Sequence, residues 1–168
     1  MLRNLPKKQR TVHTGDLMVY ERATLEDLQE ILELQHLAFE SVARKLKNPD
    51  IPPMTQDLES LTEEFNRGVF IKAVDDEGNI IGSSRGFDEG DHVVIRKLVV
   101  HPSYRNQGIG TKLIYLMEKE LPSKKYIAFT NSRSVNNLAL LETLGYSIFK
   151  KEKIDDNLTL TYLEKNVE

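Results

Sequence analysis

Two glycines one residue apart, Gly108 and Gly110, lie in the segment Arg105-Asn106-Gln107-Gly108-Ile109-Gly110. An apolar stretch that reads as a strand precedes the segment, and a helical pattern of apolar residues follows it. This order brings several unpaired backbone N–H groups and the positive end of a helix to one place, and glycine lets an anion approach the main chain. A glycine pair alone also fits an ordinary tight turn into a helix. The segment predicts an anion site, with phosphate as its natural occupant.

Two common phosphate-binding motifs do not fit this segment. A P-loop needs Gly-x-x-x-x-Gly-Lys-Ser/Thr, whereas the chain continues Gly110-Thr111-Lys112. A dinucleotide-binding fingerprint needs a third glycine where Leu113 stands, within a parallel sheet. The residues and the predicted topology therefore fit neither motif.

Composition narrows the chemistry. The 168 residues contain no cysteine, which excludes disulfides, thiolate zinc sites and an acyl group carried on a protein thiol. No two of the four histidines lie four residues apart, so we expect no metal site.

Charge and hydropathy indicate the expected cellular location and the expected classes of partner. The net charge of -3 gives no attraction to nucleic acid, and we interpret the basic segment Lys7-Lys8-Gln9-Arg10 as a solvated tail rather than a nucleic-acid-binding arm. Apolar runs are too short to cross a membrane, and the first residues lack the apolar stretch of a signal peptide. We expect a cytoplasmic protein with neither nucleic-acid nor membrane partners.

The elements around the glycines predict one domain over residues 17–168, after a tail over residues 1–16. Helical spacing predicts a helix from the cap Thr24 to about Lys45, then a connection with three prolines, then a helix with Thr55 as candidate cap and Gly68 at its end. Helices are also expected over 109–121 and 135–144, stopped by Pro122 and Gly145. Strands are expected over residues 18–22, 69–74, 80–87, 92–100, 126–130, 146–151 and 158–163.

The order of these strands indicates the fold class. Three successive strands joined by short polar turns predict an antiparallel meander, whereas the helix before residues 126–130 lets that strand run parallel to the one ending at Val100. We therefore predict an α+β fold with a mixed, mostly antiparallel sheet of about seven strands and helices on both faces.

The run from Leu98 to Leu113 resembles the cofactor-binding core of the GNAT N-acetyltransferase superfamily, whose signature is Gln/Arg-x-x-Gly-x-Gly/Ala. The resemblance includes the preceding apolar strand, the His-Pro corner and Leu144-Gly145-Tyr146, which is similar to the family's Leu-Gly-Phe/Tyr. It covers about Leu17 to Lys165. The phrase from Gln35 to Gln56 also resembles bacterial members without an evident substrate, which favours a bacterial source.

The resemblance implies acetyl-CoA as cosubstrate, with no metal. Its pantetheine arm inserts where the fourth strand splays from the fifth, and its pyrophosphate lies on the glycine loop. Alternatives stay open for Arg105 and Thr111, as solvated surface residues, and for Asn137, as part of a helix cap. The cofactor-binding residues implied are Leu98, Val99, Val100, Arg105, Asn106, Gln107, Gly108, Ile109, Gly110, Thr111 and Asn137.

For catalysis, the resemblance implies an N-acetyltransferase in which an amine attacks the thioester. A backbone N–H at Leu98 or Val99 is expected to stabilise the oxyanion, and we select Leu98. Because the chain lacks cysteine, we expect direct transfer in a ternary complex. Glu40, Glu89, Asp91 and His92 are candidates for the base, with an ordinary surface charge as the alternative for each, and we select Glu40 and Glu89. Leu141 stands where the family often has a proton-donating tyrosine, so the acid is unassigned.

The acceptor is expected to be an amine of a small molecule or a protein. The connection over residues 47–55 either lines its site or packs on the core. Leu141 also motivates a different hypothesis, a non-catalytic acyl-CoA-binding sensor, and a nucleotide-binding fold unrelated to acetyl transfer is a third. Family analogy adds a homodimer through the hairpin from Tyr146 to Leu163.

Overall fold

The computed structural model describes residues 18–168, and the tail predicted over residues 1–16 lies outside them. The strands are β1 (Val19–Arg22), β2 (Val69–Val74), β3 (Ile80–Asp88), β4 (Val93–Val100), β5 (Lys125–Asn131), β6 (Ser147–Asp155) and β7 (Leu158–Asn166). The helices are η3 (Leu25–Asp27), α1 (Leu28–Lys45), α2 (Pro52–Thr55), α3 (Leu58–Arg67), η4 (Pro102–Tyr104), α4 (Ile109–Glu120) and α5 (Val135–Thr143).

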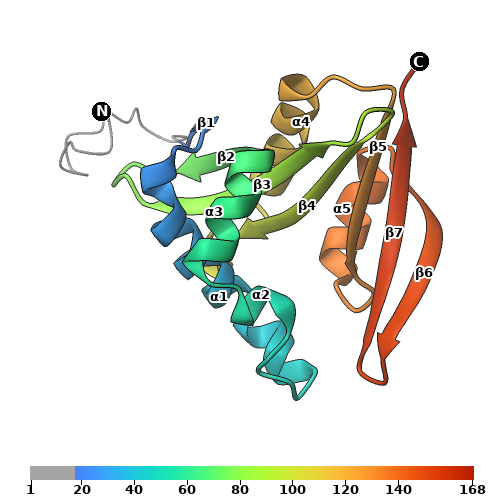
Figure 1. The fold of residues 1–168 in the computed structure, drawn as a ribbon, viewed down its shortest axis with the longest axis horizontal. Helices are drawn as coiled ribbons and strands as arrows, with labels where there is room; N and C mark the ends of the chain where they lie inside the picture. The colour runs from blue at the N-terminus through green and yellow to red at the C-terminus, as the bar shows by residue number, and fades with distance from the viewer. Residues whose placement is uncertain (1–17) are drawn as a thin grey trace.

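All seven strands form one sheet in the order β1-β2-β3-β4-β5-β7-β6 (Figure 1). Every neighbouring pair is antiparallel except β4 and β5, which are parallel. β4 and β5 can be parallel because α4 connects them, and a helix of this length returns the chain to the end of the sheet at which β4 began. The predicted α+β fold with a mixed, mostly antiparallel sheet is confirmed.

Helices cover the sheet on both sides, each with its own apolar core. On one side α4 and α5 bury residues such as Leu113, Met117 and Leu141 against β2 to β5 and β7. On the other side α1 and α3 bury residues such as Ile31 and Leu61 against β2, β3 and β4. The sheet is therefore fixed by helices packed on both of its faces.

The start of α3 differs from the prediction. Asp57, rather than Thr55, precedes the helix, and its Oδ1 accepts a hydrogen bond from the Ser60 N–H at 2.9 Å. Thr55 instead ends α2, a short helix that the sequence analysis did not predict. The prolines that end one helix can begin another, since Pro52 occupies the first position of α2, where no N–H is needed.

Candidate active site

The parallel strands β4 and β5 pair over only three positions. Val93 lies opposite Tyr126, Val94 opposite Ile127, and Ile95 opposite Ala128. Beyond Ile95, β4 continues along β3 to Val100, while β5 continues along β7 to Asn131. The facing backbone edges of these two ends have no strand partner, so they are open to a ligand's polar groups.

A β-bulge lies where β4 leaves β5. Arg96 pairs with Arg85 of β3, but Val99 pairs with Ser83, so three steps along β4 match two along β3. Lys97 occupies the extra position, with a positive φ of 56°. Such a bulge changes which way the following side chains point, and here it places Lys97 beside Arg96 on the lining of a cavity.

A cavity of about 700 Å³ opens from this point toward the start of α4. It lies between the end of α1, the splayed part of β4, the glycine loop and the start of α5. Ten of the eleven predicted cofactor residues line it, and Gln107 is the exception. Those ten are Leu98, Val99, Val100, Arg105, Asn106, Gly108, Ile109, Gly110, Thr111 and Asn137.

The glycine loop presents its backbone to this cavity. Asn106 and Gly108 have positive φ angles of 64° and 79°. Within residues 18–168, no backbone hydrogen bond is donated by the N–H groups from Gly108 through Thr111, whereas the next one, Lys112, bonds to the Gly108 carbonyl at 3.1 Å. Arg105 and Asn106 form a hydrogen-bonded turn just before them. A Cβ on Gly108 would meet nothing within 4 Å. These free donors and this space suit an anion at the N-terminus of α4.

The loop is fixed to the sheet just before the glycines. The His101 N–H bonds to the Ile81 carbonyl at 2.7 Å, and His101 Nδ1 accepts the Ser103 N–H at 3.0 Å. The Tyr104 hydroxyl donates to Asp75 Oδ2 at 2.9 Å. These bonds hold the free N–H groups in place before a ligand arrives.

The side chains around this cavity add positive charge. Lys45 of α1, Arg105 of the loop and Arg133 after β5 line it, and no carboxylate does among the described residues. Three cations without a counter-charge favour a polyanion. The sequence analysis identified Arg105 but missed Lys45 and Arg133, because only the fold brings the end of α1 and the turn after β5 to the loop.

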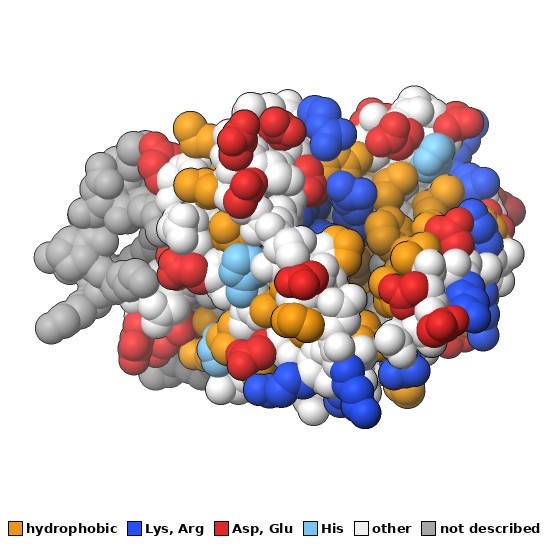
Figure 2. Space-filling view, turned by 60° about the horizontal axis from the view of Figure 1, so that its bottom comes forward, with side chains coloured by type: hydrophobic (Ala, Val, Ile, Leu, Met, Phe, Trp, Pro, Cys, Tyr) orange, Lys and Arg blue, Asp and Glu red, His pale blue; other side chains and the backbone are white. Residues whose placement is uncertain are grey.

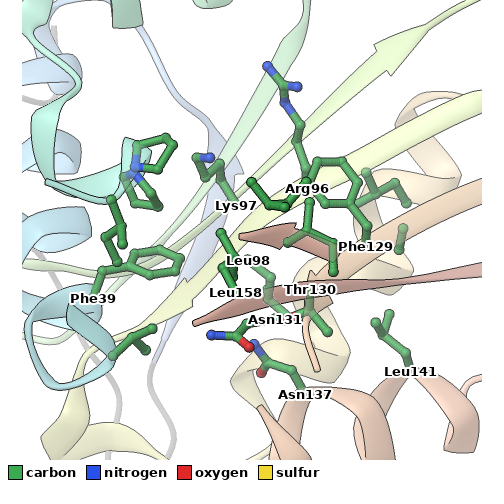
Figure 3. A pocket seen from close by; sticks show the side chains of 18 of the residues that line it. Phe39, Arg96, Lys97, Leu98, Phe129, Thr130, Asn131, Asn137, Leu141 and Leu158 are labelled. Carbon is green, nitrogen blue, oxygen red and sulfur yellow. The ribbon is translucent and has the colours of Figure 1, made fainter. Parts of the chain in front are cut away.

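A second cavity, of about 290 Å³, adjoins the first between α1, α2 and the open edge of β5 (Figure 3). Phe39, Leu98, Phe129 and Leu158 belong to its mostly apolar lining. The connection after α1 contributes Ile51, Pro52 and Pro53. The two cavities share the residues Phe39, Val42, Leu46, Leu98, Asn131 and Asn137.

Few lining residues of the smaller cavity can exchange a proton. Leu141 lines it and is buried, and among the described lining residues only Arg96 and Lys97 are titratable. Glu40 and Glu89 line neither cavity. Both are exposed, and Glu40 pairs with Arg44 at 3.2 Å. Their placement does not favour a role as base.

Behind Arg96 and Lys97 lies a buried polar cluster that the sequence analysis did not predict. Arg85, 1% exposed, contacts Glu64 at 3.2 Å and Gln56 at 3.3 Å, and also donates to Gln35. Arg96 reaches the same Glu64 oxygen at 3.2 Å. A sequence signal existed, since charges inside the apolar strands β3 and β4 are unusual unless paired.

Burial and charge shift the pKa values of this cluster. Burial, together with the nearby charges of Arg85 and Arg96, lowers the pKa of Lys97 to about 8, and the opposite effect of Glu64 is smaller. Burial also lowers the pKa of Arg85 to about 10, against the attraction of Glu64. For Glu64, burial alone would raise the pKa, but Arg85, Arg96 and the hydrogen bonds of Arg96 and Gln56 outweigh it and lower the pKa.

Within residues 18–168, no helix is long and apolar enough to cross a membrane. Nor do the histidines, aspartates and glutamates of the described part of the chain form a group of three or more suited to hold a metal ion.

One family model matches most of this chain. The model of the acetyltransferase (GNAT) family matches residues 26–146. The comparison with curated proteins found no match.

Several solved structures share the fold. The ribosomal-protein-S18-alanine N-acetyltransferase from Escherichia coli has a TM-score of 0.74 at 14% identity, covering 90% of this chain and 95% of its own. The PaiA N-acetyltransferase from Thermoplasma acidophilum, in complex with coenzyme A, has 0.71 at 16%, covering 90% and 99%. A phosphinothricin acetyltransferase from Sinorhizobium meliloti, in complex with acetyl-CoA, has 0.71 at 19%, covering 89% and 88%.

Proposed function

Because the chain belongs to the acetyltransferase (GNAT) family, we propose that it transfers the acetyl group of acetyl-CoA directly to a primary amine within a ternary complex. The observation that carries this proposal is the junction of the two cavities at Leu98. The larger cavity suits the cofactor and the smaller one suits the acceptor. Both reach the same backbone segment, where the acetyl group would be exchanged.

The larger cavity has the features that coenzyme A requires. Its free N–H groups at the glycine loop suit a pyrophosphate, and Lys45, Arg105 and Arg133 add the counter-charge. The open edge of β4 from Leu98 to Val100 suits the amides of the pantetheine arm, much as a strand edge binds a peptide. Two of the three solved structures described above contain coenzyme A or acetyl-CoA, which supports this ligand.

The role proposed for Leu98 is to hold the developing oxyanion. Transfer forms a bond between the amine nitrogen and the acetyl carbon, breaks the carbon–sulfur bond and places negative charge on the carbonyl oxygen on the way. The Leu98 N–H lies in the bulged, unpaired part of β4 that lines both cavities. The chain has no cysteine, so no thiol takes up the acetyl group between the two substrates.

Few protein groups near the smaller cavity are available to accept a proton from the acceptor amine. An alkylamine with a pKa near 10.4 is only about 0.1% unprotonated at pH 7.4, so its proton has to leave before attack. No carboxylate or histidine lines the smaller cavity among the described residues. We therefore assign the loss of this proton to solvent that enters with the acceptor, with Glu40 and Glu89 kept as bases to be tested.

A second function is favoured by one observation. Leu141 lines the smaller cavity and offers no proton to a departing thiolate. A protein that binds acyl-CoA without turning it over, as a sensor, needs no such donor. The sensor and the enzyme share the cofactor cavity and differ only in turnover.

The test combines binding with turnover. We expect coenzyme A and acetyl-CoA, but neither ATP nor NAD, to raise the melting temperature, and thiol release from acetyl-CoA to depend on an added amine. Intersecting double-reciprocal lines would support a ternary complex, whereas parallel lines would contradict direct transfer. Binding of coenzyme A without thiol release from any amine would favour the sensor, and no stabilisation by either thioester or thiol would refute both functions.

A further inference from the structure

The smaller cavity carries positive charge on an otherwise apolar wall. Its charged lining residues within the described chain are Arg96 and Lys97, which are consecutive in the bulge of β4. Figure 3 shows the Lys97 side chain extending from β4 toward the side of the cavity on which Phe39 lies, whereas the Arg96 guanidinium points away from the middle of the cavity. In the space-filling view, hydrophobic side chains surround a hollow with Lys and Arg side chains at its rim (Figure 2).

The hydrogen bonds of the cluster behind this wall do not involve Lys97. Glu64 accepts from Arg85 and Arg96, each at 3.2 Å, and Arg85 also donates to Gln35 and Gln56. Lys97 makes no hydrogen bond or ion pair with any described residue. The Nε atoms of Arg85 and Arg96 are also buried without partners. Lys97 is therefore a donor group that the described residues leave free.

The charges of the cluster do not balance. The charged groups that act on Lys97 are Arg85, Arg96 and Glu64, so three cations share one carboxylate. Unpaired charge is costly to bury, and such a group normally has a partner or a lowered pKa. The pKa of Lys97 is lowered to about 8, which leaves most of it charged at neutral pH. An anion in the cavity would relieve this imbalance.

The other lining residues of the smaller cavity indicate the chemistry of the rest of the ligand. Phe39, Ile51, Phe129 and Leu158 offer no charge, and the volume of about 290 Å³ is at the small end of ligand pockets. A cationic polyamine would meet Arg96 and Lys97 without a carboxylate to pair with. An amine with an apolar side chain and an acidic group fits both features.

We propose that the acceptor is a small amine that also carries a carboxylate and an apolar side chain, the chemistry of a hydrophobic amino acid, and that Lys97, assisted by Arg96, binds the carboxylate. This inference rests on the proposed acetyltransferase function and adds the substrate class. Lys97 would act as a binding residue for the acceptor, since its ammonium group can donate several hydrogen bonds to a carboxylate.

The experiment compares matched acceptors in the thiol-release assay. Leucine, methionine and phenylalanine are set against their carboxamides and against isoamylamine and 2-phenylethylamine. We expect kcat/KM to be roughly 10- to 100-fold higher for the amino acids, as for loss of a charged hydrogen bond. In K97M, KM for the amino acids should rise by a similar factor, with little change for the amides. K119M, on the exposed face of α4, is the matched control and should behave as wild type.

The outcomes separate this inference from the function on which it rests. Melting curves and coenzyme A binding of K97M show first that the variant is folded. Equal or better turnover of the carboxamides and simple amines, with equal effects of K97M on all acceptors, would overturn the acceptor class while leaving the acetyltransferase intact. Coenzyme A binding with no turnover of any amine, and no further stabilisation by the amino acids, would overturn both.

Discussion

Ile95 of β4 lies opposite Ala128 of β5 in the last paired position of the two parallel strands. Beyond this pair each strand follows its outer neighbour, and the bulge at Lys97 begins within two residues. The same short stretch therefore opens the sheet for the cofactor and directs two cations to the acceptor side. Cofactor and acceptor determinants are adjacent in the chain, which allows them to be tested separately by substitution.

Gly108 offers a test of the phosphate site. In G108A, the methyl group would enter the open space over the loop, and the positive φ of 79° would add backbone strain. We expect the dissociation constant for coenzyme A to rise about tenfold, by calorimetry. Gly90 is the matched control, since its φ is 96° and its Cβ would also meet nothing within 4 Å. G90A should lose a similar stability, about 1 kcal/mol, and keep its affinity; an equal loss of affinity in both would reject the site.

Lys45 tests the electrostatic part of the same site. Its neighbour Arg44 is also basic but does not line the cofactor cavity. K45Q should weaken coenzyme A binding about two- to fivefold at low salt, as expected for one partly exposed charge, and the effect should shrink as salt increases. R44Q should change the affinity by less than about twofold. Equal effects of both substitutions would indicate general rather than local attraction.

Much of the fold was predictable because its signals are local. The alternation of apolar residues and the turn residues placed β2 at Val69–Val74, as observed, and the other strands within a few residues. The prediction of Thr55 as the cap of α3 was wrong. Thr55 and Asp57 are both good caps, and the sequence alone did not show that Pro52 begins a helix of its own.

The site was predictable only in part, because half of it is assembled from distant segments. The glycine loop is contiguous and carries its chemistry in its own backbone, and ten of the eleven predicted cofactor residues line one cavity. Arg133 and Lys45 reach that cavity only through the fold. The bulge did leave a signal, since two consecutive charges, Arg96 and Lys97, interrupt the alternation of a strand.

Glu40 and Glu89 are tested as bases by E40Q and E89Q. Both side chains are exposed and line neither cavity, so a proton on the acceptor is out of their direct reach. We expect kcat/KM within about twofold of wild type and an unchanged pH profile. A loss of more than tenfold, together with disappearance of the acidic limb of the profile, would assign the base to that residue.

Glu64 is expected to be a major stabilising residue of the buried cluster. E64Q would leave Arg85 and Arg96 without their counter-charge, and breaking a buried pair in this way costs about 3–5 kcal/mol of unfolding free energy. E63Q, on the exposed side of α3, is the control and should change stability by less than about 0.5 kcal/mol. Urea denaturation measures both, and an E64Q protein as stable as wild type would contradict the role.

The pH dependence of the same variant follows from the pKa of Glu64. Because that pKa is lowered in the folded protein, the unfolded chain binds the proton first as pH falls. The stabilisation by Glu64 is fully present above the unfolded pKa of about 4.3 and is lost as pH falls through the folded value. The difference between wild type and E64Q should be constant from pH 6 to 7 and shrink in acid.

Substitution of Lys97 should change the free energy of unfolding in the opposite direction to substitution of Glu64, since the position of Lys97 serves binding rather than stability. Its pKa is lowered from 10.5 to about 8 in the folded protein, mainly by burial. At pH 7 the charged amine is therefore less stable in the folded than in the unfolded chain. We expect K97M to be more stable than wild type by about 2 to 3 kcal/mol at pH 7, by urea denaturation.

This gain should disappear as pH rises. Between about pH 8 and pH 10.5 the unfolded chain holds the Lys97 proton and the folded protein does not, so wild type gains stability with pH relative to K97M. A hydrophobic amino acid bound with coenzyme A should also narrow the gap at pH 7, because its carboxylate pairs with the ammonium group. K119M should show neither effect. A K97M protein less stable than wild type at pH 7 would mean that Lys97 already has a counter-charge and would remove the basis for a bound carboxylate.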